Sequence, residues 1–421
     1  MSDELARMRE RLAEQVVAAN GICGESIASA LRDVPRHLFL PDLRPDLAYA
    51  DEAIVTKRDE AGRPVSSSSQ PAMMAIMLYQ LGLAPGQRVL EIGAGTGYNA
   101  ALMQHIVGDS GQVTSVDIDP ELVGKARAHL ASAGYPEVTV VCADGAEGCP
   151  EHAPYDRIIA TVGVSDLAPA WLDQAMPAAR IVVPLDVRGT QVCVAFARAD
   201  AGRWTTKSLA PCGFMRMRGS LAGPERIVTL APGLHVTLPD GVMQPGGQDV
   251  DGEALAAVLA GPAVMRETGV SAGPAEVFWE LGLWLATREP RACRVDEEGP
   301  ADPARTGSAG RIGHAPLRGR GWRATVGLLD SGSIALLNAS TDPAGEPSGP
   351  LTLVAAGFGP GASELAADLA ADARAWDAAG RPGVAGLRVD AFPRPVAGGP
   401  APGPGALVLE RVFTRFAVYH A

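Results

Sequence analysis

Short apolar runs alternate with helical stretches between residues 88 and 184, and this alternation limits the fold more than any other feature of the sequence. Strands that alternate with helices form a parallel sheet with helices on both faces. Because such strands are buried on both sides, they are almost continuously hydrophobic. The sequence therefore predicts an α/β fold whose strands are Arg88 to Ile92, Val113 to Asp117, Val138 to Cys142, Arg157 to Ala160 and Ala179 to Pro184.

The segments on either side of this region complete a first domain. Apolar residues at helical spacing over residues 4–19, and again from Ile27 to Leu31, predict an N-terminal helical cap within residues 1–50. Two apolar runs, Gln191 to Arg198 and Trp204 to Leu209, predict a hairpin at the edge of the sheet. We therefore expect the first domain to span residues 1–223.

The second half of the chain, residues 224–421, predicts an α+β domain. Helical periodicity covers Glu276 to Thr287 and Ser363 to Ala379. The segments 295–320 and 392–405 are rich in proline, glycine and charge, which is typical of loops. Strand-like segments lie at Arg323 to Leu329, Ser333 to Leu337, Leu351 to Ala356 and Leu407 to Tyr419.

Composition excludes several classes of protein. Of the 421 residues, 47% are hydrophobic, so the chain can build large cores, and the net charge of −12 argues against nonspecific binding to nucleic acid or anionic membranes. The first 15 residues do not resemble a signal peptide, and no apolar run is long enough for a membrane span. The six cysteines are scattered without a CxxC pair. This spacing predicts free thiols in the cytoplasm and no metal site.

A glycine-rich turn follows the first predicted strand. Gly93, Gly95 and Gly97 lie between that strand and a helix over residues 99–107, so a ligand can approach the backbone and the helix N-terminus. Asp117 ends the next strand, where a carboxylate binds ribose hydroxyls in nucleotide sites. The pattern predicts a nucleotide-like ligand. The alternative is a structural turn, with Asp117 as a solvated strand end.

The spacing G-x-G-x-G, preceded by Val-Leu-Glu-Ile with Glu91, resembles the S-adenosylmethionine site of class I methyltransferases. This resemblance implies a Rossmann-like sheet, S-adenosylmethionine as the cofactor, and Glu91 among the cofactor-binding residues. It also implies that Asp144 and Gly145, at the end of the third strand, lie beside the adenine amino group. An ordinary Asp-Gly turn is the alternative for these two residues.

A serine-rich segment, residues 64–71, precedes a helix. Taken alone, Ser68 or Ser69 fits a helix N-cap before a proline. Together with the segments 34–41 and 48–51, however, it resembles the protein-L-isoaspartate O-methyltransferase family over residues 5–210. The resemblance implies that Ser69 contacts the acceptor carboxylate and that Ser67 replaces a threonine of the family.

Two departures from the family bear on the acceptor. The run of four serines replaces Thr-Ile-Ser, and a polar insert over residues 57–63 could widen the mouth of the site. Family repair enzymes also end near the middle of this chain, whereas longer relatives tailor ribosomally made peptides such as lanthipeptides and graspetides.

Three functions follow from this resemblance. We favour an enzyme that methylates an aspartate of a precursor peptide to give aspartimide or isoaspartate. The alternatives are general repair of isoaspartyl proteins and a non-catalytic S-adenosylmethionine-binding protein. Under the favoured hypothesis, the segments 213–219 and 411–419 grip the peptide. Their alternative is ordinary core and edge-strand packing.

Overall fold

The computed structural model divides into two compact units. Unit 1 comprises Met1–Leu185, Gln191–Gly223 and Arg388–Val418, and unit 2 comprises Asp186–Thr190, Pro224–Leu387 and Tyr419–Ala421. The structure describes residues 2–21, 24–60, 62–199, 202–223, 226–239, 249–298, 312, 315–319, 322–340, 349–394 and 405–420. Most of the two long loops expected at 295–320 and 392–405 therefore lies outside the described residues.

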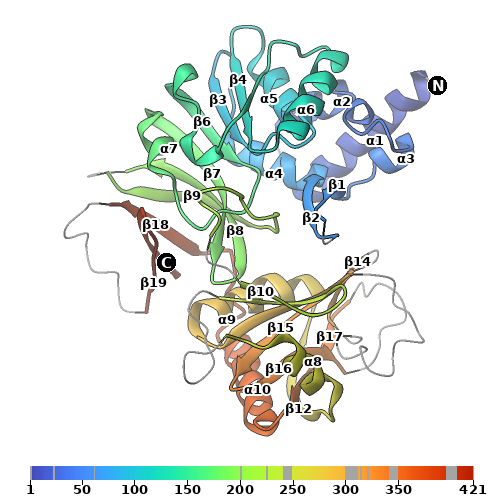
Figure 1. Cartoon of the computed structure of the whole chain (residues 1–421), viewed down its shortest axis with the longest axis vertical. Coiled ribbons are helices and arrows are strands. Elements are labelled where there is room, and N and C mark those ends of the chain that lie inside the picture. The colour runs from blue at the N-terminus through green and yellow to red at the C-terminus, as the bar shows by residue number, and fades with distance from the viewer. Residues whose placement is uncertain are drawn as a thin grey trace. The chain divides into compact units, whose positions relative to one another are not determined.

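Unit 1 contains the predicted parallel strands, which form one end of a large sheet (Figure 1). Within the described residues, its strand order is β19-β20-β18-β9-β8-β7-β6-β3-β4-β5. The pairs β3–β4, β4–β5, β3–β6 and β6–β7 are parallel. All five predicted strands are confirmed, as β3 (Arg88–Ile92), β4 (Gln112–Asp117), β5 (Thr139–Cys142), β6 (Tyr155–Ala160) and β7 (Ala175–Val187).

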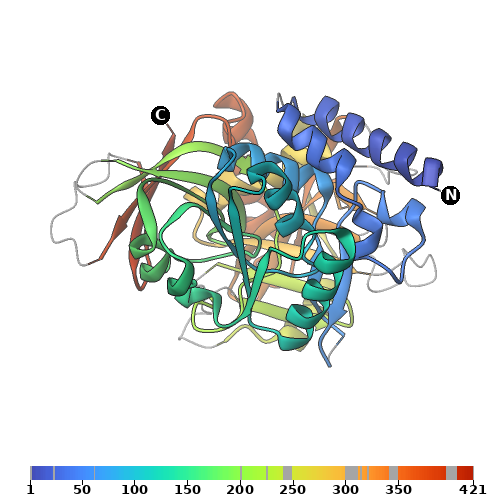
Figure 2. The ribbon, with the colours of Figure 1, turned by 90° about the horizontal axis from the view of Figure 1, so that it is seen from above.

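Helices cover this sheet and form the predicted cap. The helix α5 packs against β3 and β4, and α6 packs against β4 and β5. The cap helices α1 and α2 lie along each other, as Figure 2 shows near the N-terminus, and contact α4 and α5. Their apolar faces join one core with the sheet. The elements are α1 (Ser2–Asn20), α2 (Glu25–Asp33), η1 (Arg36–Phe39), α3 (Pro45–Ala48), α4 (Pro71–Leu81), α5 (Tyr98–Val107), α6 (Pro120–Ala133), η2 (Gly145–Glu147), η3 (Pro150–His152) and α7 (Pro169–Asp173).

The last strands of the chain return to the first sheet. The predicted hairpin forms as β8 (Thr190–Arg198) and β9 (Trp204–Pro211), and β18 (Leu387–Pro393) pairs antiparallel with β9. The expected single strand near the C-terminus is instead two, β19 (Leu407–Glu410) and β20 (Thr414–His420), because the chain turns at residues 411–413. Unit 1 is thus discontinuous, unlike the continuous domains 1–223 and 224–421 expected from the sequence.

Unit 2 is built on an antiparallel sheet of the order β10-β11-β13-β15-β16-β17-β12, with β14 beside β15. The helix α10 packs against β12, β16 and β17, so this unit has the expected α+β architecture. The expected helix 276–287 begins with a π-helical turn, η4. The elements are β10 (Arg226–Ala231), β11 (Leu234–Leu238), α8 (Gly252–Ala260), β12 (Val264–Ala272), η4 (Glu276–Leu281), α9 (Gly282–Arg288), β13 (Ala292–Glu298), β14 (Leu317–Gly319), β15 (Trp322–Asp330), β16 (Ser333–Ala339), β17 (Leu351–Phe358) and α10 (Ala362–Ala378).

Two further observations concern the described residues. Their cysteines are free thiols, and four of these five are buried. None of their helices combines the length and the apolar character that crossing a membrane requires.

Candidate functional site

The glycine turn adopts a backbone that only glycine accepts readily. Gly93, Gly95 and Gly97 have φ values of 102°, 52° and 87°. A Cβ added at Gly93 would lie 2.7 Å from Oγ1 of Thr161, so there is also no space for a side chain there. A Cβ added at Gly95 would lie 3.6 Å from the carbonyl oxygen of Ser67. The glycine turn and the serine-rich segment are therefore neighbours.

Asp117 fixes this turn from the end of β4. Its Oδ2 accepts a hydrogen bond of 3.0 Å from the backbone N–H of Gly95, and its Oδ1 accepts one of 3.0 Å from the N–H of Asp119. The residue is only 8% exposed. Because each carboxylate oxygen has a second lone pair, Asp117 can also accept bonds from ribose hydroxyls.

Asp144 is held by a segment far away in the sequence. Its Oδ1 accepts from the N–H of Ala146 at 3.0 Å, and its Oδ2 accepts from the N–H of Ser220 at 2.8 Å. Burial alone would raise the pKa of Asp144, but these backbone bonds outweigh burial and lower its pKa. Gly145 is buried, and a Cβ added there would lie 3.2 Å from Cε of Met217.

The segment 213–219 therefore belongs to unit 1 and borders the predicted cofactor residues. Arg218 adds a charge there, since its guanidinium lies 3.8 Å from Asp117 and 3.5 Å from Asp119. The sequence predicted a peptide-gripping role for this segment and did not reveal Arg218 or Ser220 as neighbours of the cofactor residues. Its contacts to Asp144 and Asp117 depend on tertiary packing alone.

A Gly219→Ala variant should bind S-adenosylhomocysteine about 10-fold more weakly. Gly219 has a φ of 89°, and an added Cβ would lie 2.7 Å from Oδ2 of Asp144, so the variant must break the Asp144–Ser220 bond or shift the carboxylate. Gly202→Ala is the matched control, because Gly202 has a φ of 79° but nothing within 4 Å of its added Cβ. Calorimetry measures both affinities. Equal affinities for the two variants would contradict the prediction.

Glu91 lies beneath the glycine turn, with no exposed surface. Its Oε1 accepts from Nδ2 of Asn99 at 2.8 Å, and its Oε2 accepts from Oγ of Ser115 at 2.6 Å. Burial raises the pKa of Glu91 to about 7, although these two bonds oppose the rise. The carboxylate thus joins β3, β4 and α5, and its contact with the cofactor stays a prediction.

Glu91→Gln should flatten the pH dependence of stability. The pKa of Glu91 rises from an ordinary 4.5 to about 7 on folding, so the folded protein keeps a proton that the unfolded chain releases between these values. The free energy of unfolding therefore decreases as the pH rises from about 4.5 to about 7, by roughly 3 kcal/mol over the whole range. Denaturant unfolding of both proteins at pH 5 and pH 8 measures the difference.

Comparing wild type with Glu91→Gln also controls for a second buried acid that affects the pH dependence of stability. Burial raises the pKa of Asp372, in unit 2, to about 6, which acts in the same direction but is present in both proteins. Only the difference between the two proteins therefore belongs to Glu91. An identical fall in stability from pH 5 to pH 8 would show that Glu91 does not hold this proton.

The serine-rich segment forms the strand β2 (Pro64–Ser68), which pairs with β1 (Ile54–Arg58). The helix α4 begins at Pro71, and its N-cap is Gln70, which makes no side-chain capping bond. Oδ1 of Asp51 accepts instead from the N–H of Ala72 at 2.8 Å. The N-cap interpretation of Ser68 and Ser69 is therefore wrong.

Because Asp51 provides the capping bond, the Ser69 side chain is not needed for it. In the part of the chain that the structure describes, neither Ser69 nor Ser67 makes a side-chain hydrogen bond, and both residues are half-buried. Their hydroxyls are available to a ligand. The carbonyl of Ser67 lies close to the glycine turn, as described above, so a ligand between the two segments would meet both.

The polar insert forms the β1–β2 hairpin and contacts the start of α6. Nζ of Lys57 lies 2.8 Å from Oδ2 of Asp119 and 2.7 Å from Oε2 of Glu121. Arg218 reaches the same Asp119 carboxylate. The hairpin is therefore attached to the N-terminus of α6, and the expected widening of the site mouth stays a prediction.

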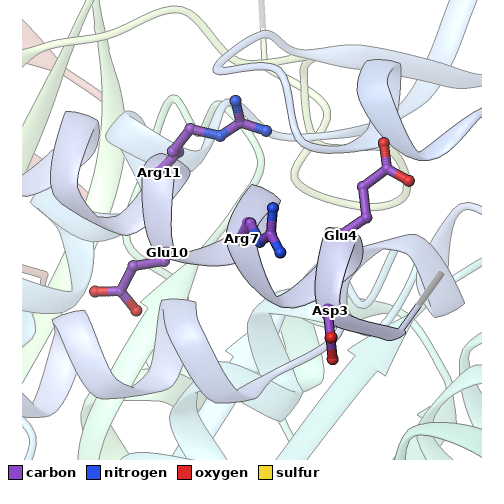
Figure 3. A pocket seen from close by; sticks show the side chains of 5 residues that line it. All are labelled: Asp3, Glu4, Arg7, Glu10 and Arg11. Atoms are coloured by element: carbon purple, nitrogen blue, oxygen red, sulfur yellow. The ribbon is translucent and has the colours of Figure 1, made fainter.

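A pocket on the first helix is separate from these residues. It is lined by the exposed charged side chains of α1 that Figure 3 draws, namely Asp3, Glu4, Arg7, Glu10 and Arg11. These side chains project from one helix toward solvent, and none of the predicted site residues lines the pocket. We do not assign a function to it.

Comparison with known proteins decides the class of this site. The family model for protein-L-isoaspartate(D-aspartate) O-methyltransferase matches residues 7–221. The chain belongs to this family. It is therefore an S-adenosylmethionine-dependent carboxyl O-methyltransferase, which confirms the enzyme class and the cofactor expected from the sequence. The match ends before residue 224, so most of unit 2 and the strands β18 to β20 lie outside it.

Two relatives identified by sequence agree with this family. The protein-L-isoaspartate O-methyltransferase of Hyperthermus butylicus is 37% identical over 225 residues, covering 52% of this chain and 91% of the relative. That of Methanopyrus kandleri is 36% identical over 214 residues, covering 51% and 92%. A solved structure titled protein-L-isoaspartate O-methyltransferase has a TM-score of 0.49 and 22% identity, over 91% of this chain and 96% of that one.

The residues of this methyltransferase suit its cofactor. The glycine turn keeps side chains away from the N-terminus of α5, and Asp117 retains lone pairs for ribose hydroxyls. We expect the predicted residues Gly93, Gly95, Gly97, Asp117, Asp144 and Gly145 to hold S-adenosylmethionine, with Arg218 and Ser220 in support.

Proposed function

We propose that this methyltransferase esterifies the free α-carboxylate of isoaspartyl residues in proteins, with Ser69 as the residue that orients the acceptor. The names of its relatives support this substrate. The observation that carries the proposal is the Ser69 hydroxyl, which has no hydrogen-bond partner among the described residues because Asp51 caps α4 instead. This hydroxyl lies on the segment that adjoins the glycine turn.

Methyl transfer to a carboxylate depends on how the two reacting groups are oriented and needs no proton transfer. S-adenosylmethionine supplies an electrophilic methyl group. A carboxylate is already ionised at neutral pH, so no general base is required. Ser69 donates a hydrogen bond that orients the carboxylate, and the neutral hydroxyl leaves it more nucleophilic than a lysine or arginine would.

The methyl ester then allows rearrangement without further catalysis. The following backbone nitrogen attacks the ester carbonyl, methanol leaves, and a succinimide ring closes. Hydrolysis of the ring opens either carbonyl, which gives aspartate or isoaspartate. Repeated methylation of the isoaspartyl product therefore drives the residue toward aspartate, so general repair needs only this one enzyme activity.

Tailoring of one precursor peptide is the second candidate. It is favoured by the residues beyond the family match, which form most of unit 2 and add β18 to β20 to the methyltransferase sheet. A tailoring enzyme would methylate an ordinary aspartate of its own peptide and stop at aspartimide or isoaspartate. The family assignment makes the chain an enzyme, so the non-catalytic alternative is not carried further.

Methyl transfer to defined peptides tests the proposal. Repair predicts base-labile methyl ester on several unrelated isoaspartyl peptides and none on their aspartyl counterparts. Tailoring predicts the reverse: unrelated isoaspartyl peptides stay unmethylated, and an aspartyl precursor peptide is the substrate. Wild-type protein that leaves every isoaspartyl peptide unmethylated would reject repair.

Ser69→Ala should lower kcat on the accepted peptide about 10- to 100-fold, because it removes one hydrogen bond to a charged group. The affinity for S-adenosylhomocysteine should stay unchanged. Ser68→Ala is the matched control, since the neighbouring Ser68 hydroxyl is buried and has no hydrogen-bond partner among the residues that the structure describes. If Ser69→Ala turned over as fast as Ser68→Ala, Ser69 would not be an acceptor residue.

A further inference from the structure

Arg36 is a fully buried arginine in η1, beneath the serine-rich segment. Its Nη2 donates to the carbonyl oxygen of Ser69 at 3.1 Å and to that of Glu52 at 3.3 Å. Glu52 lies just before β1, and Ser69 lies just after β2. One guanidinium nitrogen therefore holds both ends of the β1–β2 hairpin.

The same side chain contacts the cofactor side of the site. Cζ of Arg36 lies 5.4 Å from the centre of the Tyr98 ring, and Tyr98 is the first residue of α5, directly after Gly97. A ring contact of this kind attracts a cation to the aromatic face. Arg36 therefore contacts the serine-rich segment and the end of the glycine turn at once.

Neighbouring residues strengthen this connection. The Phe39 ring, also in η1, lies 5.4 Å from the Tyr98 ring and 6.2 Å from the ring of His129. Nδ1 of His129 lies 3.0 Å from the carbonyl oxygen of Thr96, inside the glycine turn. The short helix η1 is thus packed between the acceptor segment and the cofactor turn.

Arg36 is costly for the stability of the fold. Its Nε and Nη1 are buried without hydrogen-bond partners among the described residues, and burial lowers its pKa. A buried cation with unpaired donors destabilises a protein, whereas an apolar side chain of similar size is often neutral or stabilising. Packing alone therefore does not account for an arginine here.

We propose that Arg36 is a positioning residue for methyl transfer, which fixes the backbone of Ser69 against the helix that follows the glycine turn. The proposal rests on the function proposed above for Ser69. It predicts that Arg36 acts through Ser69 and does not touch the acceptor or the cofactor. Removing the guanidinium should therefore lower kcat and leave the cofactor affinity intact.

A double-mutant cycle with R36M and S69A tests this action. R36M should lower kcat about 10- to 100-fold and change the Kd of S-adenosylhomocysteine by less than threefold. R36M leaves the Ser69 hydroxyl misplaced, and S69A removes it. Both changes therefore abolish the same interaction, and the double variant should lose no more activity than the worse single variant. R36K, which keeps a cation able to donate to both carbonyls, should recover part of kcat.

Hydrogen exchange gives a second readout that does not depend on activity. In R36M, the amides of residues 66–70 and of Ala72 should exchange at least 10-fold faster, whereas those of α10, in unit 2, should not change. R36Q is too short to bridge both carbonyls and is measured in the same way if R36M does not fold.

Any one of three results would overturn the proposal. The kcat of R36M could lie within threefold of wild type, or the losses of kcat in the two single variants could multiply in the double variant. The third is unchanged amide hydrogen exchange over residues 66–72 in R36M. Wild-type turnover of S69A alone would instead reject the role of Ser69 in the proposed function. The exchange measurement would then still decide whether Arg36 orders the segment.

Discussion

Asp117→Asn is expected to weaken S-adenosylhomocysteine binding at least about 100-fold while the protein remains folded. The Asp117 carboxylate accepts from the backbone N–H of Gly95 and of Asp119, and we expect it to accept from the ribose as well. An asparagine of the same shape loses the charge and turns an N–H₂ group toward one of these donors. Losing two charge-assisted bonds costs about 3 kcal/mol or more.

Calorimetric titration measures this effect, with Asp173→Asn as the control at an exposed aspartate on α7. The control should bind like wild type. The result also separates two roles, because Asp117→Asn should weaken cofactor binding strongly whereas Ser69→Ala should leave it unchanged. If folded Asp117→Asn protein bound within threefold of wild type, Asp117 would not be a cofactor residue.

A truncated chain of residues 1–223 is expected to be insoluble or unfolded, although it contains the whole family match. The strands β18 to β20 belong to unit 1, and removing them leaves β9 as an unpaired edge. Asp390 accepts from Oγ1 of Thr205 at 2.7 Å and from Nη1 of Arg203 at 3.0 Å, and both bonds would be lost.

The truncation also removes buried apolar side chains from the core of unit 1. Phe416, fully buried in β20, packs 6.4 Å from the Phe196 ring of β8, measured between ring centres. Losing one such buried aromatic costs about 2 to 3 kcal/mol, and β18 to β20 carry several buried side chains. A loss of this size is comparable with the stability of a typical domain.

An internal deletion is the matched comparison. Replacing residues 224–387 by a flexible glycine-serine linker removes most of unit 2 but keeps Arg388–Val418 in the chain. This variant should fold and bind S-adenosylhomocysteine. Sedimentation, far-UV circular dichroism and calorimetry compare the two variants. A soluble 1–223 chain with wild-type affinity would show that β18 to β20 are dispensable.

The internal deletion also addresses the acceptor. A repair enzyme should keep its activity on isoaspartyl peptides when residues 224–387 are absent, because the family match lies outside them. A tailoring enzyme whose peptide is held by unit 2 should lose activity on that peptide and still bind the cofactor. The two candidate functions therefore predict opposite outcomes for the same variant.

The parallel strands and the glycine turn could be predicted from the sequence, because each is set by residues close together in the chain. The strands β3, β4, β6 and β7 appear as apolar runs because most of their residues are buried on both faces of the sheet. The glycine turn and Asp117 follow from the positive φ values and the polar strand end that a ligand at this edge requires. Each of these features is set by a few adjacent residues, so spacing alone reveals it.

The connections between distant segments could be decided only by the tertiary structure. Arg36 reaches the carbonyl of Ser69 across 33 positions, Ser220 reaches Asp144 across 76, and Thr205 reaches Asp390 across 185. No local period records such contacts, because they depend on how the sheet, the cap and the last strands pack. The sequence by itself determined the sheet and its glycine turn, and packing decided which distant side chains surround them and where unit 1 ends.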